Sequence, residues 1–311
     1  MVEDVGVIEA RNLTKRYGPT LAVDDLSFDV QPGIVTGFLG PNGSGKTTTM
    51  RMIVGLDGPD AGQVRIDGRL YRSVDVPMRE VGALLDAKAF HGGRSAYNHL
   101  LCLAQSNGLP KSRVDEVLAR VGLETAAKRR AGTFSMGMGQ RLGIAAALLG
   151  DPKVLMFDEP VNGLDPEGIA WIRRLMRDLA AQGRTVFVSS HLMSEMALTA
   201  DHVIVIGRGR LIRDESVSQF INSSSKASVL VRSPDPATLA AAVEAAGGVV
   251  TTDDTGALVV TNLEAPRIGE LAAAHSVILH ELAPQRASLE EAFMELTQDS
   301  LEFHAGGTVS S

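Results

Sequence analysis

Cysteine is almost absent from this sequence, because its 311 residues contain only Cys102. A chain with one cysteine can form no intrachain disulfide, so the fold must be stabilised by packing and hydrogen bonds. An excess of basic residues is absent too, since 30 Lys and Arg stand against 37 Asp and Glu and give a net charge of −7. This balance offers no electrostatic support for a nucleic-acid partner, and we expect none.

Long apolar runs are also missing. No stretch approaches the roughly 20 apolar residues that span a bilayer, and the acidic start of the chain, Met1 to Asp4, lacks the basic region of a secretory signal. We therefore expect a cytoplasmic protein with no membrane span of its own, and a membrane role would need a separate subunit. Aromatic residues make up only 4% of the chain, but hydrophobic residues reach 44%, as in ordinary globular proteins.

The most informative segment is a glycine-rich loop at residues 40–47, with the pattern G-x-x-x-x-G-K-S/T. Its glycines let backbone N–H groups surround a phosphate. Its lysine supplies a positive charge for the β- and γ-phosphates, and its last hydroxyl can bind Mg²⁺. The loop follows an apolar stretch of strand length and precedes a segment that can begin a helix facing the phosphate. The predicted nucleotide-binding residues are Gly40, Pro41, Asn42, Gly43, Ser44, Gly45, Lys46, Thr47 and Thr48.

Short apolar strands alternate with helical patterns over residues 7–215, which predicts an α/β domain with a largely parallel sheet. The strand pattern disappears between about residues 88 and 150, where we expect an inserted helical subdomain. After a polar linker the pattern restarts as β-α-β-β-α-β, typical of a small α+β domain with a ferredoxin-like fold. The predicted boundaries are 1–222 for the first domain, 223–226 for the linker, 227–297 for the accessory domain and 298–311 for a flexible tail.

Further polar residues could contribute chemistry. Asp158 and Glu159 end an apolar strand, at the edge where open α/β sheets bind their ligands. Asp158 could hold Mg²⁺ and Glu159 could orient or deprotonate an attacking water, although two solvated acids that end a strand are the alternative. Ser135 and the N–H of Gly137 begin a helix and could bind an anion, but an ordinary helix cap uses the same donors.

Taken in order, these segments resemble the ATP-binding subunit of ABC transporters. The resemblance implies a P-loop ATPase fold, with ATP and Mg²⁺ as cofactors. It implies that Tyr17 stacks on adenine and that His191 contacts the γ-phosphate, so that Lys46, Glu159 and His191 are the catalytic residues. The matching segments are Arg16 to Gly18, residues 40–47, Ser135 to Gly137, residues 154–159, Asn162 to Asp165 and Ser189 to His191.

The same resemblance implies that the chain works as a homodimer. Each ATP would lie between the phosphate loop of one copy and Ser135 and Gly137 of the other, and the loop that ends at Asp165 would cross between the copies. A separate integral-membrane permease would dock on the helical block at residues 88–150. The chain would then lie in the cytoplasm, peripheral on the inner face of the cell membrane.

Two departures from the family pattern stand out. Asp86 replaces the usual Gln beside the Mg²⁺ that Thr47 and Asp158 should hold. A carboxylate can still coordinate Mg²⁺, but it cannot donate a hydrogen bond as an amide does. The family signature L-S-G-G-Q is replaced by Phe-Ser-Met-Gly-Met at residues 134–138. This form, together with the segment 288–293, is similar to the drug-export type of the family, such as the daunorubicin-resistance ATPases.

The resemblance thus implies ATP hydrolysis coupled to export of a drug, antibiotic or lipid-like compound. An importer ATPase is one alternative, but its signature is usually closer to L-S-G-G-Q. A soluble ABC-type ATPase without a permease is another, but it usually carries a coiled-coil insertion or a second cassette, and neither is present in this sequence. A phosphotransferase would need an acceptor site, whereas Glu159 with His191 favours water.

Overall fold

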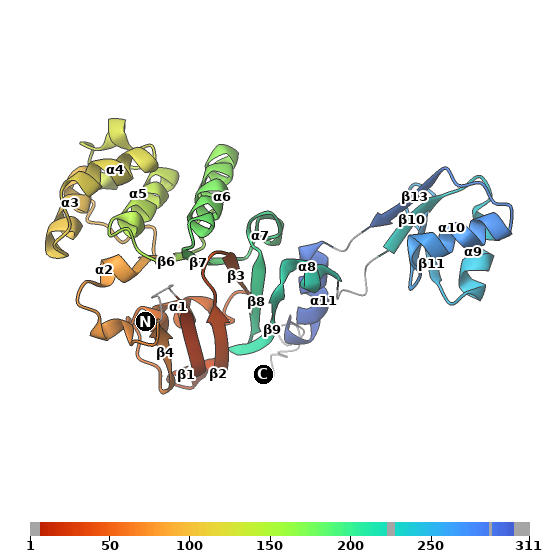
Figure 1. Ribbon diagram of the computed structural model, residues 1–311, viewed down its shortest axis with the longest axis horizontal. Coiled ribbons are helices and arrows are strands. Elements are labelled where there is room, and N and C mark those ends of the chain that lie inside the picture. Colours follow the sequence, from red (N-terminus) through yellow and green to blue (C-terminus); the bar gives the residue numbers. More distant parts are fainter. Residues whose placement is uncertain (1–6, 223–227, 286–287, 302–311) are drawn as a thin grey trace, which may run out of the picture. The chain divides into compact units, whose positions relative to one another are not determined.

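The computed structural model describes residues 7–222, 228–285 and 288–301 (Figure 1). The chain divides into two compact units, Met1–Ser216 and Val217–Ser311. The predicted linker at 223–226 lies outside the described residues, as does the part of the predicted tail at 302–311. The last helix continues to Leu301, so the first residues of the predicted tail are helical.

A six-stranded sheet forms the centre of the first unit, and all but one of its strands are parallel. The parallel strands are almost completely buried, as expected when other elements cover both faces of a sheet. The antiparallel edge strand, β9, follows β8 through a tight turn with left-handed backbone at Arg208 and Gly209. The strand order is β5 (Val81–Leu84), β6 (Val154–Asp158), β7 (Thr185–Ser190), β3 (Val35–Leu39), β8 (His202–Gly207) and β9 (Arg210–Ser216).

A second, three-stranded antiparallel sheet was not expected from the sequence. It has the order β2 (Thr20–Val30), β1 (Ile8–Tyr17), β4 (Ala61–Ile66). Its long strands mix buried and exposed positions, because only one face of this sheet packs on the core. Phe28 on β2 contacts Phe38 on β3 and Phe187 on β7, with ring centroids 5.6 and 5.8 Å apart. These few aromatic rings join the two sheets into one hydrophobic core.

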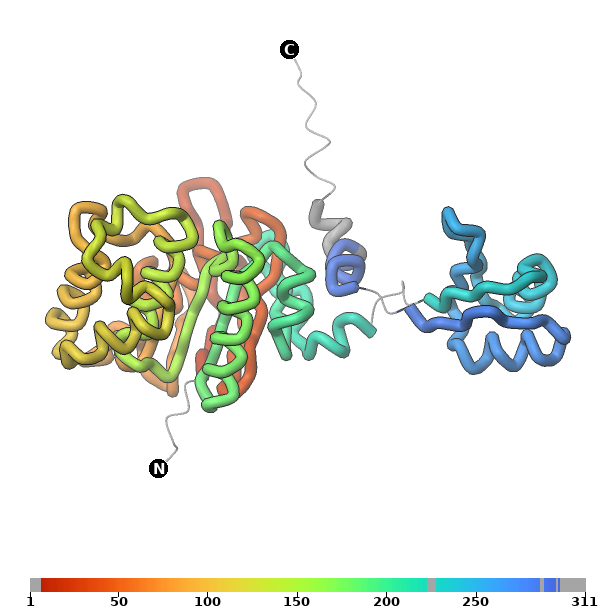
Figure 2. Tube along the Cα trace, turned by 90° about the horizontal axis from the view of Figure 1, so that it is seen from above, coloured from red at the N-terminus to blue at the C-terminus, as the bar shows by residue number. Residues whose placement is uncertain are grey.

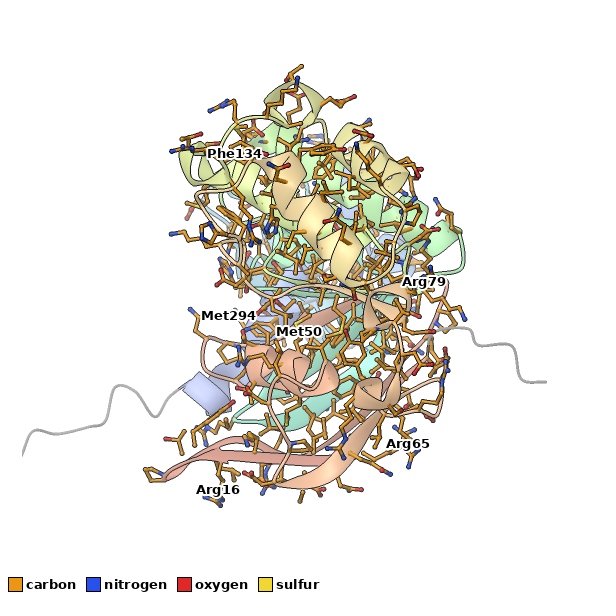
Figure 3. The ribbon with its side chains drawn as sticks, turned by 90° about the vertical axis from the view of Figure 1, so that its left-hand side faces the viewer. Arg16, Met50, Arg65, Arg79, Phe134 and Met294 are labelled. Atoms are coloured by element: carbon orange, nitrogen blue, oxygen red, sulfur yellow. The ribbon has the colours of Figure 1, made fainter. Side chains whose placement is uncertain are left out.

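Helices α3 (Ala96–Ser106), α4 (Ser112–Arg120) and α5 (Met136–Leu148) lie between β5 and β6 in sequence and contact one another. Figure 2 shows them as one yellow group beside the green α6 (Pro166–Ala181), and Figure 3 labels Phe134 in this part of the unit. The remaining helical segments of the first unit are α1 (Lys46–Ile53), α2 (Pro77–Glu80), α7 (Met193–Thr199), η1 (Tyr71–Ser73), η2 (Glu124–Ala126) and η3 (Ala131–Thr133).

The second unit has its own hydrophobic core. Its antiparallel sheet has the order β11 (Val249–Thr252), β12 (Leu258–Thr261), β10 (Ser228–Arg232), β13 (Glu281–Gln285). Helices α9 (Pro236–Ala245) and α10 (Ala265–Ala274) contribute Leu239, Val243 and Ile268 to the core beneath Val231 and Val260. Helix α8 (Val217–Asn222) begins the unit and contacts its last helix, α11 (Leu289–Leu301).

Candidate active site

The loop between β3 and α1 curves so tightly that two of its glycines have no room for a side chain. A Cβ on Gly40 would lie 2.4 Å from Ser44 Oγ and 2.5 Å from the Ile206 carbonyl oxygen. Gly45 has φ of +104°, and a Cβ there would lie 2.5 Å from the Ala22 carbonyl oxygen. Helix α1 begins directly after Gly45, so its first N–H groups are available to an anion in the loop.

Lys46 folds back over this loop. Its Nζ donates to the carbonyl oxygens of Gly40, at 2.6 Å, and Pro41, at 3.2 Å, and the residue is only 7% exposed. Burial lowers the pKa of Lys46, whereas the negative charges of Glu159 and Asp158 act in the opposite direction. The ammonium group is thus held at the loop, where an anionic phosphate would replace carbonyl oxygens as its partner.

Thr47 and Asp158 are distant in sequence but adjacent in the fold. The Thr47 hydroxyl donates to Asp158 Oδ2 at 2.7 Å, and the Ser189 hydroxyl donates to the other carboxylate oxygen. Hydroxyl and carboxylate oxygens are hard donors of the kind that Mg²⁺ prefers, and Mg²⁺ in nucleotide sites usually has few protein ligands. The donor set therefore fits this ion, although no group of three or more His, Cys, Asp or Glu able to hold a metal occurs within the described residues.

Glu159 has a left-handed backbone, with φ of +51°. Its N–H donates to Ser189 Oγ at 3.1 Å, and its carbonyl oxygen accepts from Asn162 N at 3.2 Å and from Gln140 Nε2 at 3.3 Å. Its carboxylate Oε2 lies 2.7 Å from Nδ1 of His191. Since β6 and β7 are neighbours in the sheet, their carboxyl ends bring Glu159 and His191 together.

Gln140 was not predicted as a site residue. It lies on α5 and is 2% exposed, so its amide is a buried polar group that requires a partner. A glutamine within a run of small and apolar residues was the only signal in the sequence, and it did not indicate which backbone group the amide would meet.

A hollow of about 380 Å³ lies at the centre of these groups. The phosphate loop closes one side and the end of β6 the other. The Ser44 hydroxyl is buried in the loop and has no hydrogen-bond partner among the residues that the structure describes. The residues lining the hollow are Ala22, Asn42, Gly43, Gly45, Lys46, Thr47, Thr48, Asp158 and Glu159.

Tyr17 lies at the end of β1 and is 46% exposed. Its hydroxyl donates to Asp57 Oδ2 at 2.7 Å, and Arg51 Nε donates to the same oxygen at 2.7 Å. The bond to Asp57 raises the pKa of Tyr17, while the side chain of Thr48 acts to lower it. The ring is therefore anchored at its polar end, next to the phosphate loop. Lys15 Nζ lies over one face of the ring, 5.6 Å from its centroid, so stacking would use the other face.

Ser135 and Asp165 do not line the hollow of their own chain. Ser135 caps α5 by accepting from Met138 N at 3.3 Å, and Asp165 caps α6 by accepting from Gly168 N at 2.9 Å. Both residues are exposed, and Gly137 is partly exposed. In a single copy, these predicted nucleotide-binding residues are therefore accessible to another molecule.

Asp86 is also separate from the hollow. It follows β5, and its Oδ1 accepts from the backbone N–H of Lys88 at 2.8 Å. It lines another cavity of about 590 Å³, together with Arg51, Tyr71 and His99. In the described structure Asp86 therefore does not accompany Thr47 and Asp158.

The comparisons with known proteins decide the family. A family model described as "ABC transporter" matches residues 23–162. The bacitracin transport ATP-binding protein of Bacillus licheniformis is 44% identical over 211 residues, which are 67% of this chain and 69% of that protein. The chain belongs to the ABC transporter ATP-binding proteins. The prediction that the chain is such an ATP-binding subunit, of the drug-export type, is confirmed. The predicted ATPase activity is confirmed as well.

A second relative is similar to this ABC protein over nearly its whole length. An uncharacterized ABC transporter ATP-binding protein of Bacillus subtilis strain 168 is 37% identical over 310 residues, 95% of this chain and 97% of that protein. A model described as a domain of unknown function matches residues 227–290. The second unit is therefore part of a shared arrangement rather than an addition peculiar to this chain.

A solved structure confirms the P-loop ATPase fold of the ABC unit. The dimeric structure of a bacterial ABC transporter cassette has a TM-score of 0.63 at 25% identity, and the match covers 68% of this chain and 98% of that one. No helix in the described part of the chain is long and apolar enough to cross a membrane.

Proposed function

We propose that this chain hydrolyses ATP to drive export of a drug, antibiotic or lipid-like compound through a separate permease. The observation that carries the proposal is the convergence of Lys46, Thr47, Asp158 and Glu159 around one hollow, with His191 bonded to the Glu159 carboxylate. The direction and class of cargo are supported by the bacitracin transport relative and by the signature at residues 134–138.

The site residues have distinct roles in this proposal. Lys46 and the N–H groups of the phosphate loop hold the β- and γ-phosphates. Glu159 accepts a proton from the attacking water while His191, bonded to its carboxylate, keeps that carboxylate in line with the γ-phosphorus. The water oxygen bonds to phosphorus as the bond to the bridging oxygen breaks, which yields ADP and phosphate. Mg²⁺, when held by Thr47 and Asp158, would neutralise charge on the phosphates.

We further propose that two copies complete each site. Ser135, Gly137 and Asp165 bind nucleotide in this proposal, but they lie outside the hollow of their own chain. Ser135 and Asp165 stand at the N-termini of α5 and α6, where backbone N–H groups favour an anion. The cassette solved as a dimer supports an assembly of two copies, in which these ends would meet the ATP of the other copy.

The partner in the membrane would contact the first unit at residues 88–150, which we propose to be an inserted helical subdomain. The 590 Å³ cavity supports this assignment, since residues of α3 and α5 meet residues of the β5 region there. An apolar hollow of this size suits a helix from another protein. The chain would then be cytoplasmic and peripheral on the inner face of the membrane.

We propose that residues 227–297 form a ferredoxin-like accessory domain that follows an ATPase domain ending near residue 222. The sheet order β11-β12-β10-β13 supports this proposal, as does the alternation of two strand–helix–strand halves.

Export can be tested with the chain reconstituted with its permease in lipid vesicles. We expect amphiphilic antibiotics, with bacitracin as the first probe, to increase ATP hydrolysis severalfold. The stimulation should disappear with Glu159→Gln. Co-purification of a solute-binding protein, or a complete lack of response across a panel of amphiphiles, would argue against export.

We retain Asp86 as a proposed Mg²⁺ ligand, which requires it to approach the nucleotide when ATP binds. Asp86→Gln should then raise the Mg²⁺ concentration for half-maximal hydrolysis about fivefold without abolishing ATP binding, because a neutral amide oxygen is the weaker ligand. Asp86→Asn keeps the length of the side chain and can still accept from Lys88 N, so a similar rise in this variant would assign the effect to the lost charge rather than to a changed position. Unchanged Mg²⁺ dependence and rate in Asp86→Gln would exclude the role.

A further inference from the structure

The signature helix α5 contacts the segment that carries the proposed general base of the same chain. Gln140 on α5 donates its amide to the carbonyl oxygen of Glu159, at 3.3 Å. Four residues earlier on α5, the side chain of Met136 lies directly over Gly163. A Cβ built on Gly163 would lie 2.2 Å from Met136 Sδ and 2.5 Å from its Cγ.

These two contacts form a regular arrangement. Residues four apart in a helix lie on one face, so Met136 and Gln140 present one face of α5 to the segment after β6. They meet residues that are also four apart in that segment, Glu159 and Gly163. The start of α5 and the turn at Glu159 are therefore in direct contact, and movement of one must be accommodated by the other.

The backbone of Glu159 depends on such contacts. Its φ of +51° lies in the left-handed region, which is unfavourable for a residue with a Cβ and persists only where surrounding groups enforce it. Ser189 holds its N–H from β7, and Gln140 and Asn162 hold its carbonyl oxygen. Of these partners, only Gln140 belongs to α5. The backbone of Glu159, from which its carboxylate extends, is thus held in part by this helix.

We infer that Gln140 is a positioning residue that links the two nucleotide sites of a dimer. The N-terminus of α5 would contact ATP bound to the partner copy, while Gln140 on the same helix holds Glu159 in its own site. Binding at one site would then adjust the general base of the other. The inference rests on the proposed roles of Glu159, Ser135 and Gly137.

The test uses the purified full chain and MgATP. Gln140→Met keeps the length and approximate volume of the side chain but removes the donor. We expect kcat to fall about tenfold, KM to stay within about twofold, and the Hill coefficient for ATP to fall towards one. The matched control is Gln182→Met, which alters an exposed glutamine directly after α6 and should leave all three parameters unchanged.

A second variant tests the hydrogen bond itself. Gln140→Glu can donate only when its carboxyl group is protonated, and burial favours the protonated form. Its hydrolysis rate relative to wild type should therefore recover as the pH is lowered. The rate of Gln140→Met relative to wild type should stay the same at every pH. If Gln140→Met does not fold, Gln140→Glu alone is compared with wild type. The inference is then overturned if the hydrolysis rate of Gln140→Glu relative to wild type does not change with pH.

Failure of this inference can be told apart from failure of the proposed function. If Glu159→Gln hydrolyses ATP like wild type, the proposed catalytic roles are wrong. If Glu159→Gln is inactive but Gln140→Met keeps the wild-type kcat and Hill coefficient, only the link through Gln140 is wrong. A wild-type Hill coefficient of one would also overturn communication between the sites.

Discussion

Glu159→Gln is expected to bind ATP normally but to hydrolyse it at least about a hundredfold more slowly than wild type. The amide has the size of the carboxylate and can stay beside His191 Nδ1, now 2.7 Å from Glu159 Oε2. It cannot accept a proton from water, and loss of a general base typically costs a factor of about 10² to 10⁴. Phosphate release under saturating MgATP measures the rate, and a fluorescent ATP analogue measures the affinity.

The same variant should accumulate as an ATP-bound dimer, because closure of the two sites would no longer be followed by hydrolysis. Size-exclusion chromatography with and without ATP reports this state. Glu244→Gln makes the same chemical change at an exposed position on α9 and should behave like wild type in both assays. A rate for Glu159→Gln within about threefold of wild type would contradict the assignment of the general base.

Gly45→Ala is expected to reduce the affinity for ATP by about a hundredfold or more. Gly45 has φ of +104°, and an added Cβ would lie 2.5 Å from the backbone oxygen of Ala22. The strain of a left-handed alanine and the overlap with backbone together amount to about 3 kcal/mol, which corresponds to a factor above 100 in affinity. The loop can avoid this cost only by opening, and opening would remove its N–H groups from the phosphates. Titration with a fluorescent ATP analogue gives the affinity.

Gly33→Ala separates the effect of strain from the effect of the clash. Gly33 also has a positive φ, of +79°, but no atom lies within 4 Å of the position of its Cβ. This variant should lose a small amount of thermal stability and keep the wild-type affinity for ATP. Equal affinities for Gly45→Ala and wild type would show that the narrow approach to Ala22 is not required for nucleotide binding.

The sequence predicts the strands of the central sheet more completely than the way in which they assemble. Each parallel strand is a short apolar run, which is a local signal. The three-stranded sheet of β1, β2 and β4 was missed. β1 and β2 form a hairpin across Gly18 and Pro19, but their mixture of buried and exposed positions gives a weak strand pattern. β4 pairs with β1 from a distant part of the sequence, and such pairing leaves no local mark. Gln140 was missed for the same reason, since its partner Glu159 belongs to a different element.

Asp86 shows that a position in a family pattern does not determine where the side chain lies. Its place in a family pattern predicts a Mg²⁺ ligand, and the pattern carries no information on which cavity the loop after β5 faces. The structure places its carboxylate on the backbone N–H of Lys88, away from Thr47 and Asp158.

The sequence by itself determined the chemistry of this protein: a phosphate loop, a lysine, a hydroxyl and two carboxylates, each specified within a few consecutive residues. The tertiary structure alone decided which of these groups meet. Thr47 bonds to Asp158 across 111 positions of sequence, and His191 meets Glu159 across 32. Ser135 and Asp165 lie outside the hollow of their own chain. These outcomes depend on the order of strands in the sheet and on the packing of α5 against the end of β6, which arise from contacts between distant segments.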